Sequence, residues 1–160
     1  MAKSFRAWHF GVGVLVILVG IQFVPVAHTN PPVEAQPQWD SPETEGLARA
    51  ACFDCHSNET EWPWYSYVAP VSWWTVHHVE EGRSMFNMSE EGFGRHADDA
   101  AEEVEEGEMP IWPYDWAHAG ARLSEEERAQ LVQGLRATFG GEGHEGGEHE
   151  HASEEEAHEH

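Results

Sequence analysis

The sequence predicts an all-α protein, because helix signals recur along the chain and no stretch alternates apolar and polar residues as a strand does. Two helix starts stand out, Ser41-Pro42 and the Ser124 to Glu127 capping box. Between them, apolar residues recur with the spacing i, i+3, i+4 and i+7 that marks one helix face. At 160 residues and 18.0 kDa, the chain has room for one small domain with appendages.

The first element is an apolar run at the N-terminus. Residues 10–24 contain no charged residue, Lys3 and Arg6 precede them, and the first acidic residue is Glu34. Extended over 7–27, the stretch is long enough to span a bilayer, and residues 25–30 lack a good signal-peptide cleavage pattern. We therefore expect residues 1–27 to be a single-pass transmembrane anchor, with a cleaved signal peptide as the alternative. The positive charges would hold the N-terminus in the cytoplasm and leave the rest outside it.

Two segments with little capacity to form a core flank the predicted domain. Residues 28–40 contain three prolines and are expected to be an extended linker that lifts the domain from the membrane. Residues 140–160 consist only of Gly, Glu, His, Ala and Ser, which predicts a disordered tail. The tail histidines would either bind a transition metal weakly or, as we favour, belong to a solvated acidic segment.

Residues 41–139 are predicted to form one helical domain, and its first two helices flank the cysteines. The first begins at Ser41-Pro42, with Ser as N-cap and Pro at the first helical position, and leads to Cys52. The second follows Pro70 and is expected to end at Gly82-Arg83. Its shared face consists of Val71, Trp74, Thr75, His78 and Gly82.

The last two predicted helices are recognised by different features. One has a narrow apolar stripe from Ala97 to Val104 and an acidic outer face, and the other runs from the Ser124 capping box to Gly140. Lys and Arg total 8 against 30 Asp and Glu, giving a formal net charge of -22. This charge argues against binding to nucleic acid and favours a protein partner with a basic docking face.

Both cysteines of the chain lie in the motif Cys52-Phe-Asp-Cys55-His56, the attachment pattern of c-type haem. Two thiols at this spacing can add to the two vinyl groups of one porphyrin, which places His56 beside the iron as its proximal ligand. A thioredoxin-like dithiol would need a strand before the motif, and a zinc site would need a second cysteine pair. We therefore expect a single covalent haem c.

The sixth iron ligand is expected on a loop. Met109 lies in Gly107-Glu-Met-Pro110, where a methionine can be aimed at iron without following helix geometry, although many methionines only fill a core. Methionine ligation would raise the reduction potential relative to a second histidine. His77 or His78 on the second helix is the main alternative. The remaining candidates are Met85, Met88 and His118.

Aromatic residues gather in two blocks, after the cysteines and after Met109, and are expected to wall the porphyrin. They are Trp62, Trp64, Tyr65, Tyr67, Trp73, Trp74, Trp112, Tyr114 and Trp116. Arg83 and Arg122 are candidate partners for the haem propionates, with helix capping as the alternative role.

The chain resembles the bacterial membrane-anchored haem-binding-domain proteins, which are similar to class I monohaem c-type cytochromes. The resemblance covers residues 30–137 and rests on Asn-Pro-Pro-Val at 30–33, Cys-Phe-Asp-Cys-His-Ser-Asn at 52–58, Trp-Pro-Trp-Tyr at 62–65, Ala-Pro-Val-Ser-Trp at 69–73, His78-Val79, Gly82-Arg83, Asn87, Ser89, Gly-Glu-Met-Pro at 107–110, Tyr114 and Leu123-Ser124. It implies a small cytochrome c-like fold, with Cys52, Cys55 and His56 holding one haem and Met109 in the methionine loop. It also implies a single-pass protein of the bacterial inner membrane whose haem domain faces the periplasm. The acidic helix and the tail lie outside the family pattern.

Three functions compete at this point. A tethered cytochrome would carry single electrons between respiratory or redox partners, and it would bind external ligands slowly because both axial positions are filled. A haem-based sensor or gas-binding module would leave Met109 unbound or displaceable. A peroxidase-like enzyme is the least favoured, because no distal catalytic base stands out, so we expect the protein not to be an enzyme.

Overall fold

The computed structural model describes residues 2–94 and 96–140, and within these ranges it contains helices and turns but no strand. The all-α prediction is therefore confirmed. Apart from Gly140, the disordered tail expected over residues 140–160, with its histidines, lies outside the described residues.

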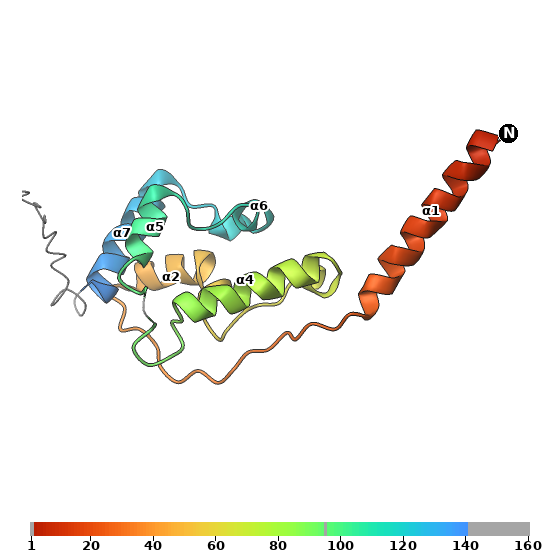
Figure 1. Ribbon diagram of the computed structural model, residues 1–160. Helices are drawn as coiled ribbons and strands as arrows, with labels where there is room; N and C mark the ends of the chain where they lie inside the picture. The colour runs from red at the N-terminus through yellow and green to blue at the C-terminus, as the bar shows by residue number, and fades with distance from the viewer. Residues whose placement is uncertain (1, 95, 141–160) are drawn as a thin grey trace, which may run out of the picture.

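The N-terminal helix α1 (Ala2–Gly20) extends away from the remaining helices (Figure 1). A 3₁₀ turn, η1 (Ile21–Phe23), follows it, and the chain becomes extended at Val24. In the part of the chain that the structure describes, no helix has both the length and the apolar character needed to cross a membrane. The transmembrane helix predicted within residues 1–27 is therefore not supported.

Residues 28–40 form an extended arm that runs along the domain (Figure 1). The Asn58 side chain donates to the Pro32 carbonyl at 2.9 Å, and the Glu34 N–H donates to the Ser89 carbonyl at 2.8 Å. At the end of the arm, the Trp39 ring packs against Phe53 and Phe139. These contacts hold the arm against the domain, so it is not a free spacer.

The first half of the domain consists of α2 (Pro42–Ala51), the short α3 (Phe53–His56), the 3₁₀ turn η2 (Trp64–Tyr67) and α4 (Val71–Met85). Helix α2 begins as predicted, because the Ser41 hydroxyl accepts a hydrogen bond from the Thr44 N–H at 3.1 Å. Helix α4 begins after Pro70 but does not end at Gly82-Arg83. It passes through Gly82 and ends at Met85.

The second half consists of α5 (Ala100–Glu106), α6 (Tyr114–Ala117), the 3₁₀ turn η3 (Ala119–Ala121) and α7 (Glu125–Phe139). Helix α7 begins with the predicted capping box and packs against α5 and α2. Its approach to α2 requires Gly134, because a Cβ there would lie 2.0 Å from the Thr44 hydroxyl oxygen. The buried core between these helices contains Ala48, Phe53, Phe86, Met88, Ala101, Val104, Leu131, Val132, Leu135 and Phe139.

Candidate functional site

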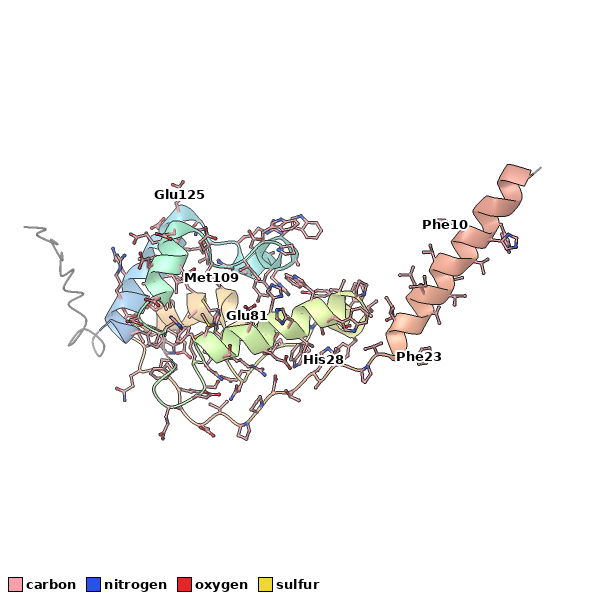
Figure 2. The ribbon with its side chains drawn as sticks, viewed as in Figure 1. Phe10, Phe23, His28, Glu81, Met109 and Glu125 are labelled. Carbon is pink, nitrogen blue, oxygen red and sulfur yellow. The ribbon has the colours of Figure 1, made fainter. Side chains whose placement is uncertain are left out.

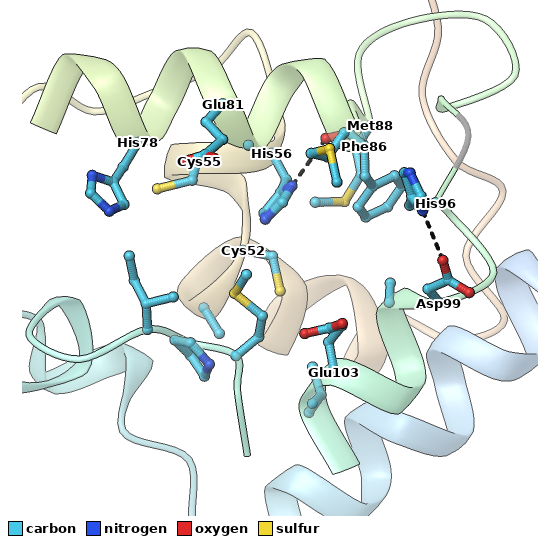
Figure 3. A pocket seen from close by; sticks show the side chains of 18 of the residues that line it. Cys52, Cys55, His56, His78, Glu81, Phe86, Met88, His96, Asp99 and Glu103 are labelled. Carbon is cyan, nitrogen blue, oxygen red and sulfur yellow. Dashed lines mark hydrogen bonds and ion pairs between the residues drawn. The ribbon is translucent and has the colours of Figure 1, made fainter. Parts of the chain in front are cut away.

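A cavity of about 430 Å³ lies between the cysteine motif, helix α4 and the segment that follows α5 (Figure 3). This volume is within the range of roughly 300–1,000 Å³ that is common for ligand pockets. Cys52, Cys55 and His56 line one side of it, and Met109 also lines it. The fold thus brings the four predicted haem-binding residues to one cavity, although Met109 is far from the other three in the sequence.

The two cysteines are free thiols at the junction of α2 and α3. Burial raises the pKa of the Cys52 thiol to about 12, and the neighbouring Cys55 adds to the increase. Burial also raises the pKa of Cys55 to about 12, with a further contribution from Asp54 and an opposing one from Arg83. Redox-active cysteine pairs depend on a lowered pKa, so these thiols do not have the character of a thioredoxin-like dithiol.

The His56 ring is oriented by a hydrogen bond between Nδ1 and the Phe86 carbonyl at 3.0 Å (Figure 3). A carbonyl only accepts, so Nδ1 carries the proton and Nε2 keeps a free lone pair. Burial lowers the pKa of His56, against the raising effect of its backbone hydrogen bonds. The imidazole is therefore neutral at pH 7 with one nitrogen ready to bind a metal, the arrangement typical of a histidine ligand.

Gly82 determines how closely α4 approaches the cysteine motif. A Cβ at this position would lie 2.6 Å from the Cys55 carbonyl oxygen and 3.1 Å from its carbonyl carbon. A glycine near the expected end of a helix suggests a terminator, and the sequence analysis interpreted it in that way. Its place within α4, directly against Cys55, shows that its function is close packing.

Met109 follows a backbone turn that redirects the chain after α5. Gly107 has a positive φ of 82° and its N–H bonds to the last carbonyls of α5, which is the usual helix ending by a left-handed glycine. The Met109 N–H then donates to the Glu103 carbonyl at 3.0 Å. Figure 2 shows Met109 on this segment, above the helix that carries Glu81. The side chain is partly buried and packs against the core.

Comparison with protein-family models matches residues 16–137, well over half of the chain, to the haem-binding domain. The chain belongs to the haem-binding-domain family. No curated protein and no solved structure matches the chain. The family match therefore supports haem as the cofactor of this domain.

The other candidates for the distal ligand of the haem-binding domain differ in position. His78 lines the cavity, and its Nδ1 is 2.8 Å from the Trp74 carbonyl oxygen. Met85 borders the cavity but is exposed, and Met88 is 1 % exposed within the core. His77 and His118 do not line this cavity. Among the predicted candidates, Met109 and His78 thus line the cavity as partly buried side chains. His77 does not line it and is no longer an alternative equal to His78.

One histidine at the cavity was missed by the sequence analysis. His96 lines it, and its Nδ1 is 2.8 Å from the Asp99 carboxylate, which lines the same cavity. Its sequence context, a polar stretch before the acidic helix, carries no motif that would have identified it.

The two predicted propionate partners are used elsewhere in the haem-binding domain. The Arg83 guanidinium donates four hydrogen bonds of 2.7–3.0 Å, to the carbonyls of Ser57 and Thr29 and to the side chains of Asn30 and Thr60. Arg122 donates to two backbone carbonyls in α6. Neither side chain lines the cavity, and both are bonded to protein acceptors, so the propionate role stays a prediction.

The aromatic blocks do not wall the cavity as predicted. Its lining contains Tyr114 but none of the tryptophans, and it includes three methionines, Met85, Met88 and Met109. Tyr65, Trp74, Trp112, Tyr114 and Trp116 instead line a second groove of about 490 Å³ between α4 and α6. The two spaces share Cys55, His78, Ile111 and Tyr114 as walls. Between them the Tyr114 hydroxyl donates to the Asp54 carboxylate at 2.8 Å, which links α6 to the cysteine motif.

Proposed function

We propose that this haem-binding domain carries one covalent haem c and transfers single electrons, and that it is not an enzyme. The observation that supports this most strongly is the cavity at which Cys52, Cys55, His56 and Met109 meet. The thiols would add across the two vinyl groups of the porphyrin, with each S–H hydrogen going to the adjacent carbon. Bound in this way, the haem supplies a reversible one-electron couple.

The residues around the cavity fit this role. His56 Nε2 is free because Nδ1 is held by Phe86, so it can bind the iron without reorienting. The Met109 thioether is a soft ligand that would favour the ferrous state. Phe86, Val104 and Leu135 line the cavity as apolar side chains that would exclude water. Low water access reduces the reorganisation that accompanies a change of charge at the site.

A haem-based sensor or gas-binding module is the alternative, and one observation favours it. His78 lines the cavity together with Met109, so a second side chain is available for the distal position. Exchange between them, or displacement of either by a small ligand, would couple ligand binding to the position of the segment that carries Met109.

We further propose that the domain works on the periplasmic side of the bacterial inner membrane, attached to it by the N-terminal helix, and that its redox partner has a basic docking face. The apolar side chains of α1, from Trp8 to Val19, are mostly exposed, which supports attachment to an apolar phase. Asp99 and Glu103 line the cavity and belong to the acidic segment 98–108, which lies beside the proposed haem. A basic partner would be steered to this side of the cavity.

The distal assignment is tested by Met109→Leu and His78→Leu in the haem-loaded protein, with Met85→Leu as a matched control on the cavity rim. We expect the near-infrared sulfur-to-iron band of the ferric protein to vanish only in Met109→Leu, carbon monoxide binding to the ferrous form to become fast, and the reduction potential to fall. Unchanged spectra in Met109→Leu would contradict the assignment. Loss of low-spin character in His78→Leu alone would transfer the role to His78 and favour the sensor.

A further inference from the structure

One end of the molecule is neutral and rich in aromatic residues, although the chain as a whole is strongly acidic. Residues 7–33 and residues 62–79 contain no Asp, Glu, Lys or Arg, in a chain with a formal net charge of -22. Over residues 109–122, the only charged side chains are Asp115 and Arg122. The charged side chains are therefore concentrated in other parts of the chain, and these three segments are nearly free of charge.

The fold brings the three segments together. The Gln22 side chain donates to the Ala69 carbonyl and accepts from the Ala69 N–H, both at 3.0 Å, which fixes the end of α1 against the segment before α4. Six residues on, the His28 ring stacks on Tyr67 with ring centroids 4.1 Å apart. Across the second groove, Trp74 on α4 faces the tryptophans of the α6 segment.

We call this surface the aromatic end, and its large side chains are exposed. Trp64, Trp112 and Trp116 are 79 %, 80 % and 72 % exposed, which leaves most of each indole in contact with the surroundings. The other members of the aromatic end are Phe23, Val24, Tyr67, Val68, Val71 and Trp74. Contiguous apolar surface of this kind marks an interaction site, because single exposed residues are common but clusters are not.

Two features of the aromatic end favour a lipid bilayer over a protein as its occupant. Tryptophan and tyrosine are enriched at membrane interfaces, where a flat ring with a polar edge suits the headgroup level. The aromatic end also adjoins α1, whose apolar side chains are exposed, because its member Phe23 lies at the end of that helix (Figure 2). The acidic helix α5 lies at the opposite end of the domain from α1 (Figure 1).

We propose that the aromatic end is a bilayer-contact surface that seats the domain on neutral, zwitterionic phospholipid. This goes beyond the proposed electron transfer and does not depend on it. Contact with the bilayer at this end turns the acidic segment 98–108 away from the membrane, where it is accessible to soluble partners. The charge of the rest of the chain disfavours anionic lipid, because like charges repel across the interface.

Photo-crosslinking tests the proposal in the full-length, haem-loaded protein mixed with phosphatidylcholine vesicles. Trp112→p-benzoylphenylalanine and Trp116→p-benzoylphenylalanine place the reactive group on the aromatic end. Gln130→p-benzoylphenylalanine and Gln133→p-benzoylphenylalanine are the controls, because both side chains are exposed on α7, which lies at the opposite end of the domain from α1 (Figure 1).

We expect phospholipid adducts at positions 112 and 116 in yields about tenfold above those at positions 130 and 133, because interfacial tryptophan rings lie at the level of the lipid headgroups. Equal lipid adducts at all four positions would overturn the proposal, as would their absence at 112 and 116. Crosslinks from 112 or 116 to a second copy of the chain would also overturn it and would identify a self-association surface. The visible haem spectrum of each variant verifies folding and reports on the haem separately, so failure here leaves the electron-transfer proposal intact.

Discussion

The two sides of the haem cavity are built in different ways. On the attachment side, which comprises residues 52–60 and 82–89, a buried network joins Asn58, Asn87 and Ser89 through hydrogen bonds of 2.9–3.0 Å. Arg83 adds four more hydrogen bonds, and Gly82 packs directly on Cys55. This side is closely packed, and its polar groups are bonded to one another.

The Met109 side, which comprises residues 107–123, has far less support. Its helical elements are α6 and η3, each a single turn, and Ala121 is the one side chain in this segment that is fully buried. Its links to the rest of the domain include the bond of Tyr114 to Asp54 and the 2.9 Å contact between the Tyr65 hydroxyl and His118 Nε2. Regions with few buried contacts open locally at low free-energy cost.

This difference indicates that the two sides of the cavity have different roles in haem binding. The attachment side is preformed, so that two thiols and one imidazole are presented in a fixed geometry. The Met109 side can move away to admit the porphyrin and close over it afterwards. Changes on the attachment side should therefore reduce stability and haem loading, and changes on the Met109 side should mainly affect the haem.

The largest expected effect is that of Gly82→Val. The new side chain would collide with the Cys55 backbone, which cannot move without displacing the cysteine motif. Overpacking of this kind costs about 3 kcal/mol or more of unfolding free energy. Urea unfolding, together with the yield of covalently attached haem, measures the effect.

Gly46→Ala is the matched control, because it lies in α2 with nothing within 4 Å of the new Cβ. It should stabilise the protein by about 0.5–1 kcal/mol, as expected for alanine in place of glycine in a helix. A Gly82→Val protein with normal stability and normal haem yield would show that the attachment side is not preformed.

The next effect in size is that of Arg83→Ala, which removes four hydrogen bonds between the arm, α4 and the loop after α3. The Ser57 carbonyl then loses a charged donor, and we expect a loss of about 2–3 kcal/mol. Arg136→Ala removes an exposed pair with Glu105 and should cost less than about 0.5 kcal/mol. Equal losses in the two variants, measured by thermal or urea unfolding, would argue against a special role for the arm.

The same contrast explains what the sequence could predict. The helix starts at Ser41 and Ser124 were predictable because capping is local, and the capping box is present as expected. The cysteine motif is equally local. Gly82 was wrongly expected to end a helix, and the hydrogen bonds of Arg83 were not predicted. Both depend on atoms of Cys55, Ser57 and Thr29, which only the folded chain brings near.

The positions of the tryptophans could not be predicted from the sequence for the same reason. Aromatic residues near a haem motif suggest a porphyrin wall, but Trp74, Trp112 and Trp116 line a separate groove. Periodicity determines which residues share a face, and Val71, Trp74, Thr75 and His78 do share one. It does not determine what that face meets, because this depends on where the α6 segment lies.

The smallest expected effect is that of Tyr114→Phe, which removes the hydrogen bond to Asp54 between the two sides of the cavity while keeping the ring. A hydrogen bond to a carboxylate contributes about 1.5–3 kcal/mol, and we expect the lower end because Tyr114 lies on the loosely held side. Tyr67→Phe, whose ring is exposed, is the control and should leave stability at pH 7 nearly unchanged.

The stability difference between the original protein and Tyr114→Phe should depend on pH in the alkaline range. Burial, and then the charge of Asp54, raises the pKa of Tyr114 well above its ordinary value. In the unfolded chain the phenol titrates near pH 10, so stability is complete below pH 10 and is lost as the pH rises above it. By pH 11 the original protein should lose about 1.4 kcal/mol that Tyr114→Phe does not lose, so the gap between them should nearly close. A gap as wide at pH 11 as at pH 7, measured by urea unfolding, would mean that Tyr114 is not held protonated against Asp54 and that the two sides of the cavity are joined elsewhere.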